Sequence, residues 1–185
     1  MKTKLTAILK SDGFKVIRRE FDTPENQYML KFFDPLYIGR AWKIVELLGL
    51  HHKPKMSILD IGSGFAYFPY LCRELGHDVV VTDVKEPLYD AVTRYLGFDK
   101  IDIQVRPFEA LPIVGDFNYI TALKAAFYQS PWLWAEAEWD FFYSDIRRLL
   151  QPRGILYITG SKSMSPMYKI GDKQHLFNGA LWKIK

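Results

Sequence analysis

The sequence predicts an α/β fold in which a doubly wound, mostly parallel sheet carries helices on both faces. Between residues 56 and 160, short apolar runs typical of buried strands alternate with amphipathic segments of helical period. A glycine-rich turn follows the first of these strands directly, as in doubly wound sheets that bind a ligand at the carboxyl ends of their strands.

Length and composition favour one soluble domain. The chain has 185 residues, of which 49% are hydrophobic, enough for a single core. The one cysteine, Cys72, excludes a disulfide scaffold and is expected to be a buried thiol. No apolar run approaches the ~18 residues of a membrane span, so we expect a cytoplasmic protein without a membrane partner.

The sequence predicts a helical lid over residues 1–55. Apolar residues recur at helical spacing over 26–33 and 39–50. Pro35 separates the two segments, because a proline disfavours helix in the residue before it, and Gly49 ends the second.

The cofactor-binding core is expected over residues 56–160, with a tail over 161–185. The elements alternate along the chain, so right-handed crossovers would make the sheet parallel. Strands are predicted at 56–61, 78–83, 101–105, 117–123 and 155–159, helices at 65–75, 87–96 and 135–150, and a candidate edge strand at 180–184.

The glycine turn carries the first functional signal. Gly62 and Gly64 would allow a ligand to approach the backbone closely, with free N–H groups at the start of the next helix. Asp60, on the strand before them, would face a bound cation. Asp83 closes the second strand at the spacing of an acid that receives ribose hydroxyls. A dinucleotide would require a third glycine at position 67, which is tyrosine.

Taken together, these features resemble the class I S-adenosylmethionine-dependent methyltransferases, which have a Rossmann-like fold. The resemblance covers about residues 56–160 and rests on the order of several short motifs. These motifs lie at 59–66, 83, 109–112, 117–120 and 147–154.

The resemblance implies S-adenosyl-L-methionine as cofactor, S-adenosyl-L-homocysteine as product, and a set of binding residues. The turn would hold the methionyl part, the acid the ribose, the loop after the third strand the adenine, and the end of the fourth strand would lie beside the methyl group. The turn residues are Asp60, Gly62, Ser63, Gly64, Phe65 and Ala66, and the ribose residues are Asp83 and Val84. The adenine residues are Phe108 and Glu109, and the residues beside the methyl group are Leu123 and Lys124.

Four positions depart from the family pattern. Ala66 replaces a glycine of the turn, and Arg153 replaces the second glycine of the helix-end motif. Asn118 replaces an acid before the fourth strand, and Pro107 replaces the acid that often contacts adenine. Adenine recognition would then depend on backbone groups, on Glu109 or on packing against Phe108.

The acceptor signal is the aromatic content after the fourth strand. Tyr128, Trp132 and Trp134 are candidates to line an acceptor site, whereas Trp139 is expected to pack its helix on the sheet. The sequence lacks the motif of amino-methylating family members and offers no paired carboxylates there, so no metal is expected.

Three further acceptor candidates are Tyr28 and Arg40 in the lid and His175 in the tail. The favoured function is methyl transfer to a small, aromatic or apolar acceptor by in-line displacement, and no single catalytic residue is identified.

The distribution of charge leaves alternative functions open. Residues 1–55 carry a net charge of +5, residues 56–150 of −6 and residues 151–185 of +5. The basic ends keep an RNA or protein acceptor open, although no nucleic-acid motif favours it. A non-catalytic module that binds S-adenosylmethionine is the remaining alternative. The sequence does not indicate an oligomeric state.

Overall fold

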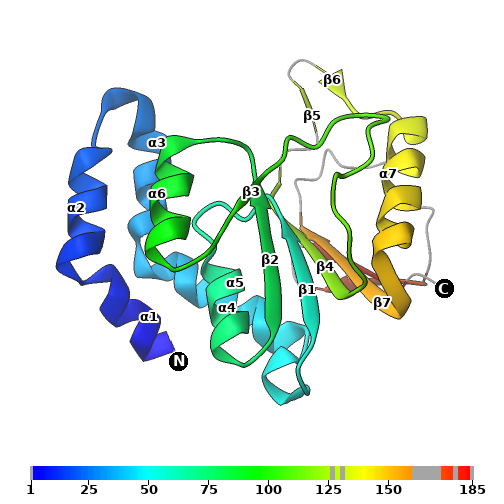
Figure 1. Ribbon diagram of the computed structural model, residues 1–185, viewed down its shortest axis with the longest axis horizontal. Helices are drawn as coiled ribbons and strands as arrows, with labels where there is room; N and C mark the ends of the chain where they lie inside the picture. Colours follow the sequence, from blue (N-terminus) through cyan, green and yellow to red (C-terminus); the bar gives the residue numbers. More distant parts are fainter. Residues whose placement is uncertain (1, 126–127, 130–131, 160–171, 177–178, 184–185) are drawn as a thin grey trace.

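The computed structural model describes residues 2–125, 128–129, 132–159, 172–176 and 179–183 (Figure 1). In these residues a seven-stranded sheet has the order β3-β2-β1-β4-β7-β9-β8. Its strands are β1 (Ser57–Ile61), β2 (Asp78–Asp83), β3 (Ile101–Asp102), β4 (Phe117–Leu123), β7 (Leu150–Thr159), β8 (Asp172–Leu176) and β9 (Gly179–Lys183). The short β5 (Tyr128–Gln129) and β6 (Trp132–Leu133) pair separately.

The sheet is mostly parallel, which confirms the expected fold class. β3, β2, β1, β4 and β7 run parallel to their neighbours, and β9 and β8 add two antiparallel pairings. The strand expected at 180–184 corresponds to β9, but it lies between β7 and β8, so β8 forms the edge. The side chain of Asn118 joins β4 to β1 by accepting the Ser57 N–H at 2.8 Å, a role in the sheet.

Side chains alternate between the two faces of the central strands, as the pleat requires. Leu59 and Ile120 pack with α7 (Glu136–Leu149) on one face. Ile58 and Tyr119 pack on the other face with the remaining long helices. Those helices are α1 (Lys2–Leu9), α2 (Asp12–Glu20), α4 (Pro35–Leu47), α5 (Tyr67–Glu74) and α6 (Pro87–Tyr95).

The front of the chain is helical, as expected, and packs on α5 and α6 (Figure 1). α4 begins four residues before the predicted 39–50 segment, because the Asp34 carboxylate accepts the Leu36 N–H at 2.7 Å and Pro35 occupies the first turn. The segment predicted at 26–33 is a run of short turns, η1 (Pro24–Asn26), α3 (Gln27–Leu30) and η2 (Lys31–Phe33). η3 (Leu50–His52) follows α4.

Helix α1, helix α2 and the β5–β6 pair were not predicted, and β3 is shorter than the predicted 101–105. β3 stops after Asp102, although the N–H of Ile103 still donates to the Asp83 carbonyl at 2.8 Å. The chain then continues as an irregular segment to β4, and no helix lies between these strands.

Candidate functional site

The candidate site lies where β1, β2 and β4 end, and the turn from β1 to α5 is its centre. The N–H groups of Gly62 and Ser63 both donate to the Thr82 carbonyl, at 2.9 and 3.0 Å. These bonds tie the turn to β2. Gly62 has φ +70°, and a Cβ there would lie 2.7 Å from the Cβ of Ala125. Only glycine fits this position without displacing the segment after β4.

Gly64 presents open backbone. Its φ is +53°, and a Cβ added there would meet no atom within 4 Å. The left-handed conformation continues at Ala66, with φ +52°, where α5 starts. The alanine that replaces a glycine is therefore held in a conformation that costs an L-residue roughly 1–2 kcal/mol. The turn is built from backbone that glycine and tight packing hold in place.

Asp83, the last residue of β2, binds this turn directly. Its carboxylate accepts the Gly64 N–H at 2.5 Å and the Val84 N–H at 2.7 Å. The residue is 8% exposed. Burial raises the pKa of Asp83 above its usual value, and the two N–H groups and the charge of Lys100 oppose that rise. The sequence-predicted acid and the glycine turn thus form one hydrogen-bonded unit.

Asp60 is the second carboxyl group of the site, and it is enclosed. It is 1% exposed and accepts a hydrogen bond from the Thr121 hydroxyl at 2.5 Å. Burial raises the pKa of Asp60 to about 7, the hydrogen bonds from Thr121 and Ser63 oppose the rise, and the charge of Asp83 adds to it. Thr121 lies opposite Asp60 in the β1–β4 register, so a strand-pairing prediction could have identified it.

Two apolar side chains among the predicted cofactor residues are exposed. Val84 is 40% exposed and Phe108 is 58% exposed. Phe108 has φ +57°, and its ring lies 5.9 Å from that of Phe141. Glu109 is exposed and pairs with Arg106 at 3.7 Å, as a surface ion pair.

Lys124 follows the end of β4, one residue after the partly buried Leu123. Lys124 has φ +60°, and its backbone N–H donates to the carbonyl and hydroxyl oxygens of Thr159, at 3.0 and 2.9 Å. These bonds turn the chain out of the sheet and leave the Lys124 side chain exposed.

The acceptor candidates are distributed over several elements. Tyr28 is 73% exposed, with the Lys31 ammonium 3.1 Å from its ring centroid. A hydrogen bond with Lys31 and the charge of that lysine lower the pKa of Tyr28, and the charge of Lys124 adds a smaller effect. The Arg40 guanidinium lies 4.8 Å from the ring centroid of Tyr37.

Trp134 points into the core. It is 5% exposed, and its ring packs 5.0 Å from that of Trp139 and 5.9 Å from that of Phe142. Trp139 is also buried, which agrees with its expected packing role. Trp134 thus lies with the α7 core residues, away from solvent.

For the other acceptor candidates, the structure describes the position of the backbone but not that of the side chain. Tyr128 is in β5 and Trp132 in β6, in the segment that follows β4. His175 is in β8, three strands from β4 and thus roughly 14 Å away at the usual ~4.8 Å spacing. The topology therefore keeps His175 apart from the glycine turn.

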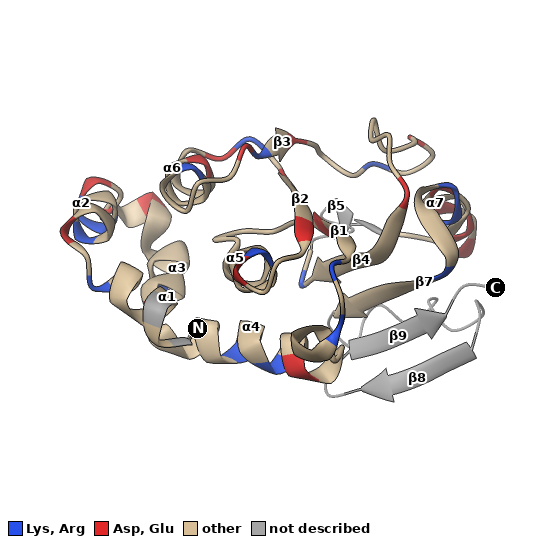
Figure 2. Cartoon of the chain, turned by 60° about the horizontal axis from the view of Figure 1, so that its bottom comes forward, with Lys and Arg blue, Asp and Glu red and all other residues tan. Residues whose placement is uncertain are grey.

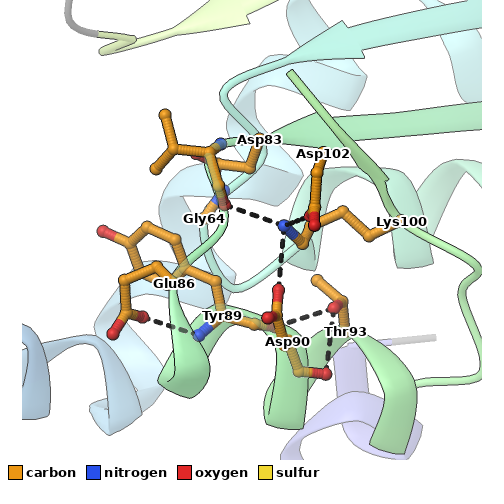
Figure 3. A network of polar contacts seen from close by, with 9 residues as sticks. Gly64, Asp83, Glu86, Tyr89, Asp90, Thr93, Lys100 and Asp102 are labelled. Atoms are coloured by element: carbon orange, nitrogen blue, oxygen red, sulfur yellow. Dashed lines mark hydrogen bonds and ion pairs between the residues drawn. The ribbon is translucent and has the colours of Figure 1, made fainter. Parts of the chain in front are cut away.

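Lys100 is a component of the site that sequence reasoning missed. Its side chain is 4% exposed and lies beneath the turn that follows Asp83 (Figure 3). Nothing marks this lysine in the sequence, because it is one of many basic residues and its burial depends on the folded contact between α6 and β3.

The described residues contain no group of three or more His, Cys, Asp or Glu side chains placed to hold a metal ion. They also contain no helix that is long and apolar enough to cross a membrane.

Comparison with solved structures supports the fold. The PH0226 protein of Pyrococcus horikoshii has 20% sequence identity and a TM-score of 0.55, over 71% of this chain and 57% of that one. A TehB-like SAM-dependent methyltransferase of Corynebacterium glutamicum has 16% identity and a TM-score of 0.53, over 82% of this chain and 100% of that one. The chain thus spans little more than half of the Pyrococcus protein and the full length of the other. A comparison with curated proteins gave no significant match.

A family model described as a methyltransferase domain matches residues 59–158, more than half of the chain. The match begins in β1 and ends in β7, so it includes the glycine turn, Asp83 and the end of β4. The chain therefore belongs to the methyltransferase domain family, which confirms the S-adenosylmethionine-dependent methyltransferase class expected from its sequence.

Proposed function

We propose that the protein transfers a methyl group from S-adenosylmethionine, held at the β1–α5 turn and Asp83, to a small acceptor. The observation that carries this proposal is the 2.5 Å hydrogen bond from the Gly64 N–H to the Asp83 carboxylate. It fixes a hydroxyl-binding acid against open glycine backbone, within a chain that belongs to a methyltransferase family.

The residues present fit such a cofactor. Each Asp83 oxygen accepts one backbone N–H, and a carboxylate oxygen has a second lone pair with which to receive a ribose hydroxyl. No atom lies within 4 Å of the place where a Gly64 side chain would project, so a ligand can approach that backbone. Val84 and Phe108 offer exposed apolar surface to an adenine ring.

The chain's contribution to catalysis is binding and alignment. When bound, S-adenosylmethionine supplies a methyl group activated by a positively charged sulfur. Asp83 and the glycine turn would hold the nucleoside and methionyl parts, so that the acceptor meets the methyl group in line. A cation at this edge would also lower the pKa of Asp60 and favour its ionised form.

We propose a small aromatic or apolar acceptor that enters beside β4. Tyr28 supports this choice, because its aromatic ring is 73% exposed on α3, within the proposed lid. Trp134 does not support an acceptor role, because its ring is buried in the core. Tyr128 and Trp132 remain candidates through their place in the segment after β4, and residues 1–55 remain the proposed lid.

An RNA acceptor receives less support. Basic and acidic residues are interspersed along α2 and α4 (Figure 2). Such mixed helices do not form the stripe of positive charge that tracks a phosphate backbone. We therefore favour a small molecule over a nucleic acid.

Titration calorimetry with S-adenosylmethionine and S-adenosylhomocysteine tests the cofactor. We expect both to bind the wild type and Asp116→Ala, which changes an exposed carboxylate on the loop before β4, and to bind Asp83→Ala much more weakly. Absence of binding to the wild type would contradict the proposal.

Incubation with methyl-labelled cofactor and a panel of small aromatic compounds, aliphatic acids, peptides and RNA then tests the acceptor. Label in an aromatic compound supports the proposed class, and label only in RNA or peptide contradicts it. Cofactor binding without transfer to any acceptor would favour the non-catalytic module.

A further inference from the structure

A buried lysine lies beneath the turn that follows β2. Lys100 precedes β3, and its side chain is 4% exposed. Its ammonium donates to the Val84 carbonyl at 2.8 Å and to the Asp102 carboxylate at 2.5 Å, and it pairs with the Asp90 carboxylate at 2.8 Å. Figure 3 shows the ammonium between α6, β3 and the turn after Asp83. A lysine is rarely enclosed to this extent unless its charge is paired.

These contacts complete the support of the Asp83 backbone. The Asp83 carboxylate accepts the N–H groups of Gly64 and Val84, and its carbonyl accepts the N–H of Ile103. The next carbonyl, that of Val84, is held by Lys100. The Asp83 carboxylate, the Asp83 carbonyl and the Val84 carbonyl therefore each have a partner, and the Lys100 ammonium supplies the last of these.

The ammonium also balances an excess of negative charge. The carboxylates of Asp90 and Asp102 contact it, and Asp102 lies opposite Asp83 in the β2–β3 register. Burial alone would lower the pKa of Lys100, but its hydrogen bonds with Asp102 and Asp90 raise it overall. Its charge in turn lowers the pKa of Asp83, against burial and Glu86.

We propose that Lys100 is a positioning residue for the cofactor site, which holds the turn after Asp83 in the conformation that binds ribose. The inference rests on the proposed function, because it assigns Asp83 to the ribose. Lys100 itself acts through the Val84 carbonyl and the carboxylates of Asp90 and Asp102, not on the ligand.

Three variants test this role by calorimetry with S-adenosylhomocysteine at pH 6 and pH 8. Lys100→Met keeps the length of the side chain and removes the charge, Lys100→Arg keeps the charge, and Lys85→Met removes an exposed charge from the same turn. Thermal unfolding of each variant is measured in parallel.

We expect Lys100→Met to weaken binding roughly tenfold or more, as for a lost charged hydrogen bond. The loss should be greater at pH 6, because the pKa of Asp83 rises without the ammonium and protonation removes a hydroxyl acceptor. Lys100→Arg should recover part of the affinity, and Lys85→Met should bind like the wild type. The other charged groups around this region, Glu86, Arg94 and Asp99, are unchanged in every variant.

Equal affinity of folded Lys100→Met and wild type at both pH values would overturn the positioning role, even if the variant melts at a lower temperature. If Lys100→Met does not fold, Asp102→Asn takes its place, since Asp102 is 48% exposed and supports the same ammonium. Unchanged binding by folded Asp102→Asn at both pH values would then overturn it. A wild type that binds no S-adenosylhomocysteine contradicts the proposed function instead.

Discussion

The two sides of the candidate site are built differently. The donor side, residues 60–66 and 83–84, consists of backbone N–H groups, positive-φ turns and carboxyl groups that are 1% and 8% exposed in Asp60 and Asp83. The proposed acceptor side, in the described residues of 28–40 and 128–134, consists of short helical turns, the start of α4 and the short strands β5 and β6, with Tyr28 at 73% exposure.

This difference explains why the family is evident and the acceptor is not. The family match begins at residue 59 and ends at residue 158, so it contains the whole donor side and the segment after β4, but neither Tyr28 nor Arg40. A ligand that all members share requires one backbone geometry, whereas exposed side chains on a short helix can be exchanged at small cost in stability. Substitutions should therefore have larger effects on the donor side than on the acceptor side.

The largest effect is expected for Gly62→Ala. The new Cβ would lie 2.7 Å from that of Ala125, at a φ of +70°. Left-handed strain and overpacking together should cost about 2–5 kcal/mol of unfolding free energy. Urea denaturation measures the loss, and calorimetry should show that cofactor binding falls with it.

Gly39→Ala is the matched control, because the same methyl group would meet no atom within 4 Å inside α4. It should leave stability unchanged or raise it slightly, since alanine favours helix. Equal destabilisation by Gly62→Ala and Gly39→Ala would contradict the prediction that only the turn requires glycine.

The next effect concerns Asp60→Asn and pH. Folded Asp60 keeps its proton up to about pH 7, whereas the unfolded chain loses it near 3.8. The folded state therefore binds more protons between these values, so this group makes the free energy of unfolding fall as pH rises from about 4 to 7. The full contribution is at most ~4 kcal/mol.

Asparagine does not titrate and can still accept the Thr121 hydroxyl. Stability of Asp60→Asn relative to wild type should thus increase from pH 5 to pH 8 in urea denaturation. Parallel stability curves for the two proteins would show that the Asp60 carboxyl is not held protonated by burial.

Asp83→Asn should act on binding more than on folding. The carboxylate of Asp83 accepts the N–H groups of Gly64 and Val84. The NH2 group of an asparagine would face one of these N–H groups, so that two donors would meet. We expect roughly a tenfold to hundredfold loss of affinity for S-adenosylhomocysteine by calorimetry. Since burial raises the pKa of Asp83, binding by the wild type should weaken on acidification at a higher pH than an ordinary aspartate would cause, and the variant should lack this dependence.

The donor side could be predicted from the sequence more fully than the acceptor side. β2, β4 and the glycine turn follow from local patterns, because β-branched runs and positive-φ glycines are set by neighbouring residues. Gly64 and Asp83, 19 residues apart, were predicted to share a ligand and are joined by a direct hydrogen bond.

Contacts between distant segments could not be predicted in the same way. Trp134 was expected to line an acceptor site, but its ring enters the α7 core, and aromatic content alone does not distinguish core from pocket. Lys100 is buried only because three oxygens from α6, β3 and the β2 turn meet around it. β8 took the edge position expected for β9, since pairing order depends on the whole sheet.

The smallest effect on stability is expected for Tyr28→Ala. The ring is 73% exposed, and a surface substitution of this kind usually changes unfolding free energy by less than about 0.5 kcal/mol. If the acceptor binds beside this ring, KM for the acceptor should rise while affinity for S-adenosylhomocysteine stays the same. Tyr28→Phe keeps the ring that faces Lys31 and should restore most of the affinity, and Val16→Ala, at an exposed position on α2, should change neither value. A Tyr28→Ala enzyme with an unchanged KM would remove Tyr28 from the acceptor side, and would leave the segment after β4 as the part of the chain that selects the acceptor.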